Sequence, residues 1–288
     1  MKPARAILIY TLLVVVTGAL LAPWLFWAVQ ATGWEPLTRH PFRRVFNRAV
    51  MVTALLGLWP LARALGIRSW SDLGYPRRAD WWRDLCAGIL LGVASLALGW
   101  VVAGKTLDFA AGKYSLPSLM GKLVLTATLV SLIEETFFRG VLQGGLQRSL
   151  RWPVACAVTS VIYSALHFLK PRVQIPADAV TWWSGFEALR QVVHGALVTP
   201  GVGLAFVSLV FVGWVLGWTF ARTKALYLPM GLHAGWVLGN EFVQHYRGGN
   251  LVQEPLVWPV VLVTGWLALR WIELKRTGTS DSSMSGAR

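Results

Sequence analysis

Apolar segments long enough to cross a lipid bilayer recur along almost the whole of this chain. Hydrophobic residues make up 55% of its 288 residues and charged residues only 14%, whereas a soluble globular domain has about 25% charged residues. In a helix, about 20 consecutive apolar residues span the hydrocarbon core. We therefore predict an all-α fold, a polytopic membrane helix bundle of about eight transmembrane helices. The predicted spans cover residues 6–29, 49–65, 85–102, 119–150, 154–169, 201–220, 225–245 and 255–274.

These spans leave no room for a separate soluble domain. We expect residues 1–274 to form a single integral-membrane domain. Residues 275–288 are rich in Ser, Thr and Gly, which predicts a disordered C-terminal tail. The first apolar run is longer than the roughly 7–15 residues typical of a signal peptide, so we interpret it as a retained transmembrane helix.

The charge of the chain is distributed as in a membrane protein. The formal net charge is +14, which in a soluble protein would suggest a nucleic-acid partner. The arginines and lysines instead fall in short clusters between the apolar runs, as in the loops of membrane proteins. The sequence therefore predicts the lipid bilayer, and no nucleic acid, as a partner.

One segment between the fifth and sixth predicted spans is amphipathic. Ser184 and Glu187 have the spacing of a capping box at a helix start. We predict one amphipathic helix that lies in the membrane interface, either as a packed surface helix or as a lid over a site. Its apolar residues recur at spacings of three and four: Trp182, Phe186, Leu189, Val193 and Leu197.

Three charged side chains, Glu134, Glu135 and Arg139, interrupt the predicted span 119–150. At membrane depth each ionised side chain costs at least about 2.5 kcal/mol, so such a cluster must be paired, hydrated or functional. On a helix, Glu135 and Arg139 stand four residues apart on one face, where a carboxylate followed by a cation pairs well. Glu134 points about 100° away. We predict an ion pair between Glu135 and Arg139 that leaves Glu134 for chemistry.

Two histidines, His167 and His233, also fall within predicted spans. Glu134 precedes the turn at Arg151 by nearly as many residues as His167 follows it, so a helical hairpin places both about 24 Å from that turn. His233 lies about 15 Å into its own span, close enough in depth to join them if the helices are staggered. We expect Glu134, His167 and His233 to converge.

A carboxylate beside two imidazoles suits acid–base catalysis. Glu134 with His167 could deprotonate a water molecule that attacks a carbonyl carbon, and His233 could stabilise the oxyanion. Zinc held by Glu134, His167 and His233 is a reasonable alternative, but the sequence has no His-Glu-x-x-His motif, and we expect chemistry without a cofactor. Either histidine alone could equally serve as an interhelical hydrogen-bond partner.

In combination these motifs resemble the CPBP family of glutamate intramembrane proteases, which includes the type II CAAX prenyl endopeptidases and their bacterial relatives. The resemblance covers about residues 119–240 and implies a bacterial inner-membrane location. It implies that Glu134 activates water with His167, that Glu135 and Arg139 support Glu134, and that His233 lies on the oxyanion side. Val237 stands where the family often has asparagine or aspartate.

The leading hypothesis is an intramembrane endopeptidase that hydrolyses a peptide bond of a membrane-associated protein or peptide. A second hypothesis, favoured by Val237, is a non-catalytic membrane partner or bacteriocin-immunity-type protein with the same fold. A third is a transporter with Glu134 and His167 as a proton relay. The absence of repeated halves in the sequence disfavours the transporter.

Overall fold

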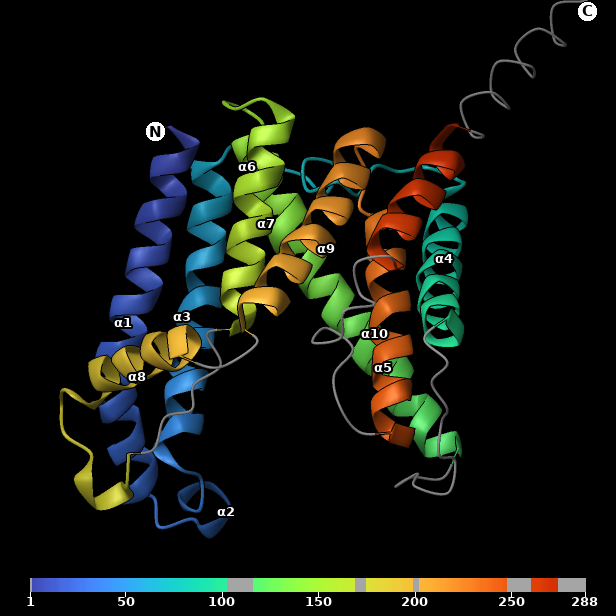
Figure 1. Cartoon of the computed structure of the whole chain (residues 1–288). Helices are drawn as coiled ribbons and strands as arrows, with labels where there is room; N and C mark the ends of the chain where they lie inside the picture. The colour runs from blue at the N-terminus through green and yellow to red at the C-terminus, as the bar shows by residue number, and fades with distance from the viewer. Residues whose placement is uncertain (1, 103–115, 169–174, 199–201, 248–259, 274–288) are drawn as a thin grey trace, which may run out of the picture. The chain divides into compact units, whose positions relative to one another are not determined.

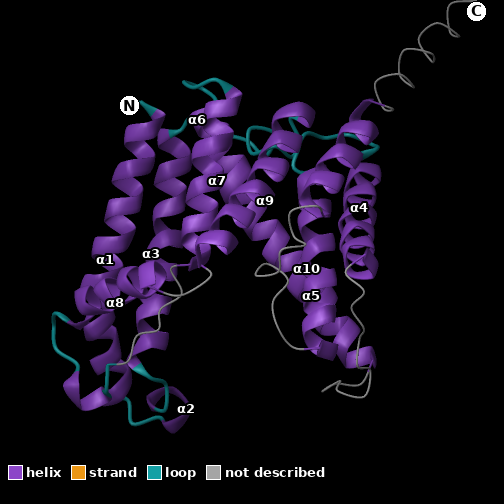
Figure 2. Ribbon diagram, viewed as in Figure 1, coloured by secondary structure: helices purple, strands orange, loops and turns teal. Residues whose placement is uncertain are grey.

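The computed structural model describes residues 2–102, 116–168, 175–198, 202–247 and 260–273, and within these ranges its regular structure is entirely helical (Figures 1 and 2). The predicted fold class is therefore confirmed. Among the described residues, five helices are long and apolar enough to cross a membrane. They are α1 (Pro3–Ala31), α3 (Phe42–Ala64), α4 (Trp81–Val102), the continuous helix Pro117–Leu146, and α9 (Val202–Thr223).

The other predicted spans also coincide with helices, so the predicted number of about eight is approximate. The fifth is the shorter apolar helix α7 (Trp152–Phe168). The seventh is the more polar α10 (Tyr227–Arg247), and the eighth is seen as a helix over residues 260–273. The predicted tail, 275–288, lies outside the described residues. The predicted start of the second span near residue 49 is wrong, because its basic N-terminal stretch continues the helix back to Phe42.

The helices group into two compact units. The first comprises Met1–Arg68 with Ala165–Gly203, and the second comprises Ser69–Ser164 with Leu204–Arg288. In the first unit, α1 packs against α3, and the short helix α2 (Glu35–Thr38) connects them. Aromatic and small side chains fill the core between them, with Phe26 and Phe42 in edge-to-face contact at 5.6 Å.

The predicted amphipathic helix is α8 (Ser184–Val198), which runs across α1 and α3 in the same unit (Figure 1). Its buried side chains include Ala188 and Val192. Of the expected apolar residues, Phe186 and Leu189 pack against the core of this unit, whereas Trp182 and Val193 are 60% and 51% exposed. The packing supports the packed-surface-helix interpretation.

The start of α8 also differs from the predicted capping box. The backbone N–H of Thr181 donates to Oγ of Ser184 at 2.8 Å, so the capping interaction lies three residues earlier than expected. Glu187 does not reach back to the helix start; it forms an ion pair with Arg190 at 2.7 Å on the exposed surface. This pair lowers the pKa of Glu187 to about 2.

The second unit carries Glu134 and His233. The chain enters it through the loop after Ser69 and then forms α4 and a long helix made of α5 (Leu116–Glu135), a π-helical segment (Thr136–Gln143) and α6 (Gly144–Leu146). This agrees with the predicted long fourth helix. α10 packs lengthwise against α4 and also contacts α5 (Figure 1). The helix over residues 260–273 covers α10 through Val261, Ala268 and Ile272.

Candidate active site

The charged cluster lies where the α-helix changes to a π-helix. α5 ends at Glu135, and the next eight residues, Thr136–Gln143, form π-helix. The N–H of Gly144 accordingly bonds to the carbonyl oxygen of Arg139, five residues back. π-Helical turns are rare and are frequently found at functional sites. The wider turn changes the direction of the side chains that follow Glu135.

Glu135 is the centre of a buried hydrogen-bonded group. One of its oxygens, Oε1, accepts from Arg139 Nη1 at 2.8 Å and lies 2.7 Å from His233 Nδ1. The carboxylate has 0% and the guanidinium 1% of its surface exposed. The predicted Glu135–Arg139 ion pair is therefore confirmed, whereas no sequence pattern indicated the hydrogen bond between His233 and Glu135. Breaking such a buried pair would leave an uncompensated charge.

Two carbonyl groups of α9 hold the π-helix in place. Arg139 donates from Nη2 to the oxygen of Gly213 at 3.2 Å, and Gln143 donates from Nε2 to the oxygen of Gly217 at 2.7 Å. Both donors and both acceptors are thus one helical turn apart. The Arg139 guanidinium also lies 4.8 Å from the ring centroid of Tyr163 on α7, within cation–π range. Gln143 is fully buried. In the sequence it follows Glu135 and Arg139 at intervals of four residues, a spacing that places all three side chains on one helix face.

Glycines fix the position of His233. A Cβ added at Gly231 would lie 2.2 Å from the carbonyl oxygen of Leu85, and one at Gly235 would lie 2.5 Å from that of Ile89. These two positions therefore let the backbones of α10 and α4 approach closely, as small residues spaced by four do in membranes. His233 is two residues from each glycine, or about 200° around the helix. The glycine face meets α4, and His233 consequently faces α5.

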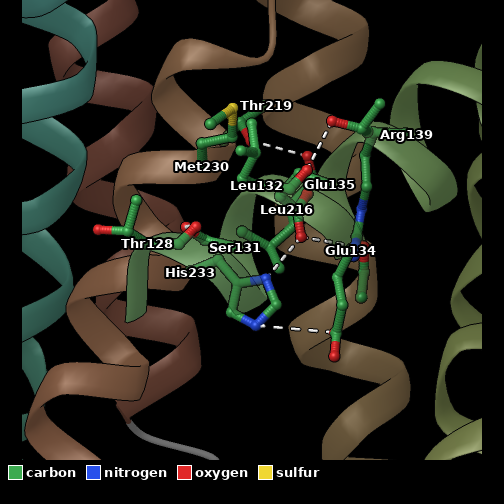
Figure 3. Close-up of polar contacts among 12 residues, drawn as sticks. Thr128, Ser131, Leu132, Glu134, Glu135, Arg139, Leu216, Thr219, Met230 and His233 are labelled. Atoms are coloured by element: carbon green, nitrogen blue, oxygen red, sulfur yellow. Dashed lines mark hydrogen bonds and ion pairs between the residues drawn. The ribbon is translucent and has the colours of Figure 1, made fainter. Parts of the chain in front are cut away.

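His233 lies between the two carboxylates of the cluster (Figure 3). While Nδ1 faces Glu135, Nε2 is 3.9 Å from Glu134 Oε2. That distance exceeds a direct hydrogen bond. Glu134 has 27% of its side chain exposed, in contrast to the buried Glu135. Adjacent glutamates thus have different environments: one is fixed in a buried ion pair, and the other is accessible.

The loop before α4 covers the start of the π-helix. The hydroxyl of Tyr75 lies 2.5 Å from Thr136 Oγ1 and 3.6 Å from Met230 Sδ. A Cβ added at Gly140 would lie 2.6 Å from the carbonyl oxygen of Leu73, so this loop passes directly over the helix backbone. Burial is the main cause that raises the pKa of Tyr75 above its ordinary value. No sequence pattern indicated these contacts.

His167 lies near the end of α7 and is half-buried. Residues from Ala165 to Gly203 belong to the first unit, whereas Glu134 and His233 belong to the second. The expected approach of His167 to Glu134 therefore stays a prediction. Tyr163, one turn earlier on α7, lies within the second unit, and its ring centroid is 6.3 Å from that of His233.

The described ranges contain no group of three or more His, Cys, Asp or Glu side chains that could hold a metal ion. In His233, Nδ1 is engaged by Glu135, which leaves Nε2 as the nitrogen available to a ligand. The zinc alternative also requires His167, so both it and the cofactor-free chemistry stay predictions.

Residues 116–239 match the sequence model of the family described as Type II CAAX prenyl endopeptidase Rce1-like. The matched segment nearly coincides with the expected range of 119–240, and it contains all five predicted site residues. The resemblance indicated by the motifs is thereby confirmed. Searches of the curated proteins and of the solved structures returned no significant match.

Proposed function

We propose that this protein is an intramembrane endopeptidase. The premise is that residues 116–239 match the type II CAAX prenyl endopeptidase Rce1-like family model and lie in an integral membrane protein. The enzyme would hydrolyse a peptide bond of a membrane-associated protein in a bacterial cell membrane. The observation that carries the proposal is the line Glu135–His233–Glu134, in which a buried carboxylate orients an imidazole toward a second, accessible carboxylate. A prenyl group on the substrate is not part of the proposal.

In the proposed reaction, Glu134 is the general base. It takes a proton from a water molecule, the resulting hydroxide attacks the carbonyl carbon, and the carbon–nitrogen bond breaks as the leaving amine takes up that proton. The 27% exposure of the Glu134 side chain supports this role because water must reach the carboxyl group, although Oε2, the oxygen that faces His233, is itself buried. Glu134 Oε2 lies 3.9 Å from His233 Nε2. This distance is too long for a direct hydrogen bond and supports a water oxygen that contacts both groups. His167 stays the expected second partner of the water.

Glu135 and Arg139 have positioning roles in this proposal. Glu135 Oε1 accepts a hydrogen bond from Arg139 and lies 2.7 Å from His233 Nδ1, so this contact fixes the orientation of the imidazole ring. In the proposal, His233 stabilises the oxyanion with an N–H donor at Nε2, the nitrogen that faces Glu134. Removing one oxyanion donor typically slows a reaction by about 10²–10³-fold. The second donor is not provided at position 237, which is valine.

Val237 favours the second candidate function, a non-catalytic membrane partner of the immunity type. The two candidates differ in whether the protein cleaves anything. The experiment is to reconstitute the purified protein in liposomes with a library of membrane-anchored peptides and to identify new termini by mass spectrometry. The endopeptidase predicts defined cleavage sites near the membrane surface. Intact peptides throughout, with a folded protein, would favour the non-catalytic function.

A further inference from the structure

Two short turns of the second unit adjoin at one end of its helices. One turn, residues 147–151, connects α6 to α7, and the other, residues 224–226, connects α9 to α10. Trp152 is the first residue of α7, and its ring centroid lies 6.3 Å from that of Trp214 on α9. The start of α7 therefore packs against the last part of α9, although the two segments are more than 60 residues apart in the sequence.

Two tryptophan rings hold the exposed side chain of Arg222 near the end of α9. The guanidinium carbon lies 5.7 Å from the ring centroid of Trp218, one turn earlier, and 5.8 Å from that of Trp152. Both distances are within the range of a cation–π interaction. With 22 residues, α9 is long enough to cross the hydrocarbon core, and tryptophan rings concentrate at headgroup level. Arg222 is therefore held at the surface of the bilayer.

Three more cations lie on the same two turns, and all are exposed. One directly precedes Trp152 and another follows Arg222 by two residues, so the contact between these two side chains brings the charges of both turns together. We call these four cations the basic rim: Arg148, Arg151, Arg222 and Lys224. Residues 147–152 and 222–226 contain no acidic residue. Within the described ranges, no side chain of the basic rim forms an ion pair with a carboxylate.

The backbone of Lys224 would favour a glycine. Its φ is 54°, in the left-handed region that residues with a Cβ rarely adopt, and helices commonly end with glycine in this conformation. Its N–H donates to the carbonyl oxygen of Phe220 at 2.8 Å, which closes the last turn of α9. A cation at a helix C-terminus is electrostatically favourable. The turn thus carries an exposed positive charge where the backbone alone favours no side chain.

We infer that the basic rim binds the phosphate groups of anionic glycerophospholipids in the leaflet at this end of the protein. A guanidinium group can donate two parallel hydrogen bonds to phosphate oxygens, and basic pockets between membrane helices bind anionic headgroups. A lipid phosphate lies at the depth of the tryptophan rings, whereas a nucleic acid or an acidic protein would approach from the water beyond them. This inference goes beyond the proposed hydrolysis and does not depend on it.

The test titrates the purified protein in neutral detergent with phosphatidylglycerol and measures the tightest dissociation constant by native mass spectrometry. The double variant Arg151→Gln, Arg222→Gln should raise this constant about 30-fold, since losing each basic residue near an anionic surface weakens binding about fivefold. The matched control Arg43→Gln, Arg44→Gln removes two exposed arginines from the first turn of α3 and should leave the constant unchanged. Equal effects of the two double variants would overturn the inference, because net charge alone would explain them.

A second measurement uses only the wild type, so that it does not depend on the folding of a variant. Phosphatidylglycerol should bind at least about tenfold more tightly than phosphatidylcholine, whose headgroup has no net charge, and added salt should reduce this preference. Equal binding of the two lipids would overturn the inference. Inorganic phosphate at the same concentration should not displace phosphatidylglycerol. Displacement would show that the basic rim binds free phosphate, which would also overturn the inference.

Discussion

At the scale of the residue, two neighbouring glutamates have different environments. Glu135 is buried and shares one oxygen between Arg139 and His233, while Glu134 is accessible. The pairing of Glu135 with Arg139 could be predicted because residues four apart share a helix face. The bond from His233 could not, because helical periodicity does not determine which faces of distant helices meet. The amide of Gln143 was overlooked although its spacing placed it on the same face as Arg139.

The buried ion pair predicts a large loss of stability for Arg139→Met. Removing the guanidinium leaves the Glu135 carboxylate uncompensated, which costs about 3–5 kcal/mol for buried pairs. Thermal unfolding in detergent measures the effect. The matched control is Arg190→Met, which breaks the exposed pair with Glu187; because solvent screens such a pair, little change in the unfolding temperature is expected. Equal unfolding temperatures for the two variants would show that the buried pair does not stabilise the fold.

The chemistry at Glu134 should not depend on a metal. Nδ1 of His233 already contacts Glu135, so only Nε2 of this ring faces Glu134. One imidazole nitrogen beside one carboxylate suits proton transfer. We therefore expect proteolysis by the purified protein to continue at an unchanged rate after dialysis against a zinc chelator. Loss of cleavage on chelation, with recovery on adding zinc, would support the alternative in which Glu134, His167 and His233 hold the ion.

At the scale of the element, the hydrophobic runs predicted most helices but not their irregularities. The long fourth helix was expected, yet its π-helical segment was not, because an apolar pattern does not distinguish one additional residue in a turn. The start of α3 was placed too late because arginines were read as a loop, although they extend the helix. On α8 the spacing of large residues suggested one face, whereas the smaller Ala188 allows close packing on another.

The glycines between α4 and α10 predict a stability difference between two similar substitutions. Gly231→Ala places a Cβ 2.2 Å from the carbonyl oxygen of Leu85, so the helices must separate. Overpacking of this kind costs about 1–3 kcal/mol, and the shift moves His233 away from Glu135. Gly121→Ala on α5 meets nothing within 4 Å. Alanine is the better helix former, so Gly121→Ala should unfold at the same or a higher temperature.

Unfolding temperature and activity together measure this difference. We expect Gly231→Ala to lower the unfolding temperature and to slow cleavage, with Gly121→Ala as the matched control. If Gly231→Ala unfolds at the wild-type temperature and cleaves at the wild-type rate, then close packing of α4 on α10 does not position His233.

At the scale of the whole molecule, composition and hydropathy were sufficient to predict an all-helical membrane protein, and the spaced motifs were sufficient to predict the resemblance that residues 116–239 show to the Rce1-like family model. The division of the chain into two compact units could not be predicted from such patterns, since the hydrophobic period describes one helix at a time. The convergence of His167 with Glu134, predicted from equal depths, likewise stays a prediction. The central claim is that the second unit contains the base of a peptide hydrolase, and that base is one side chain.

The most direct measurement is therefore the cleavage rate of a membrane-anchored peptide by wild type and by Glu134→Gln in the same liposomes. The account predicts that Glu134→Gln is slower by about 10²–10⁴-fold, the range for loss of a general base, with an unchanged unfolding temperature. Cleavage by Glu134→Gln at the wild-type rate would contradict it.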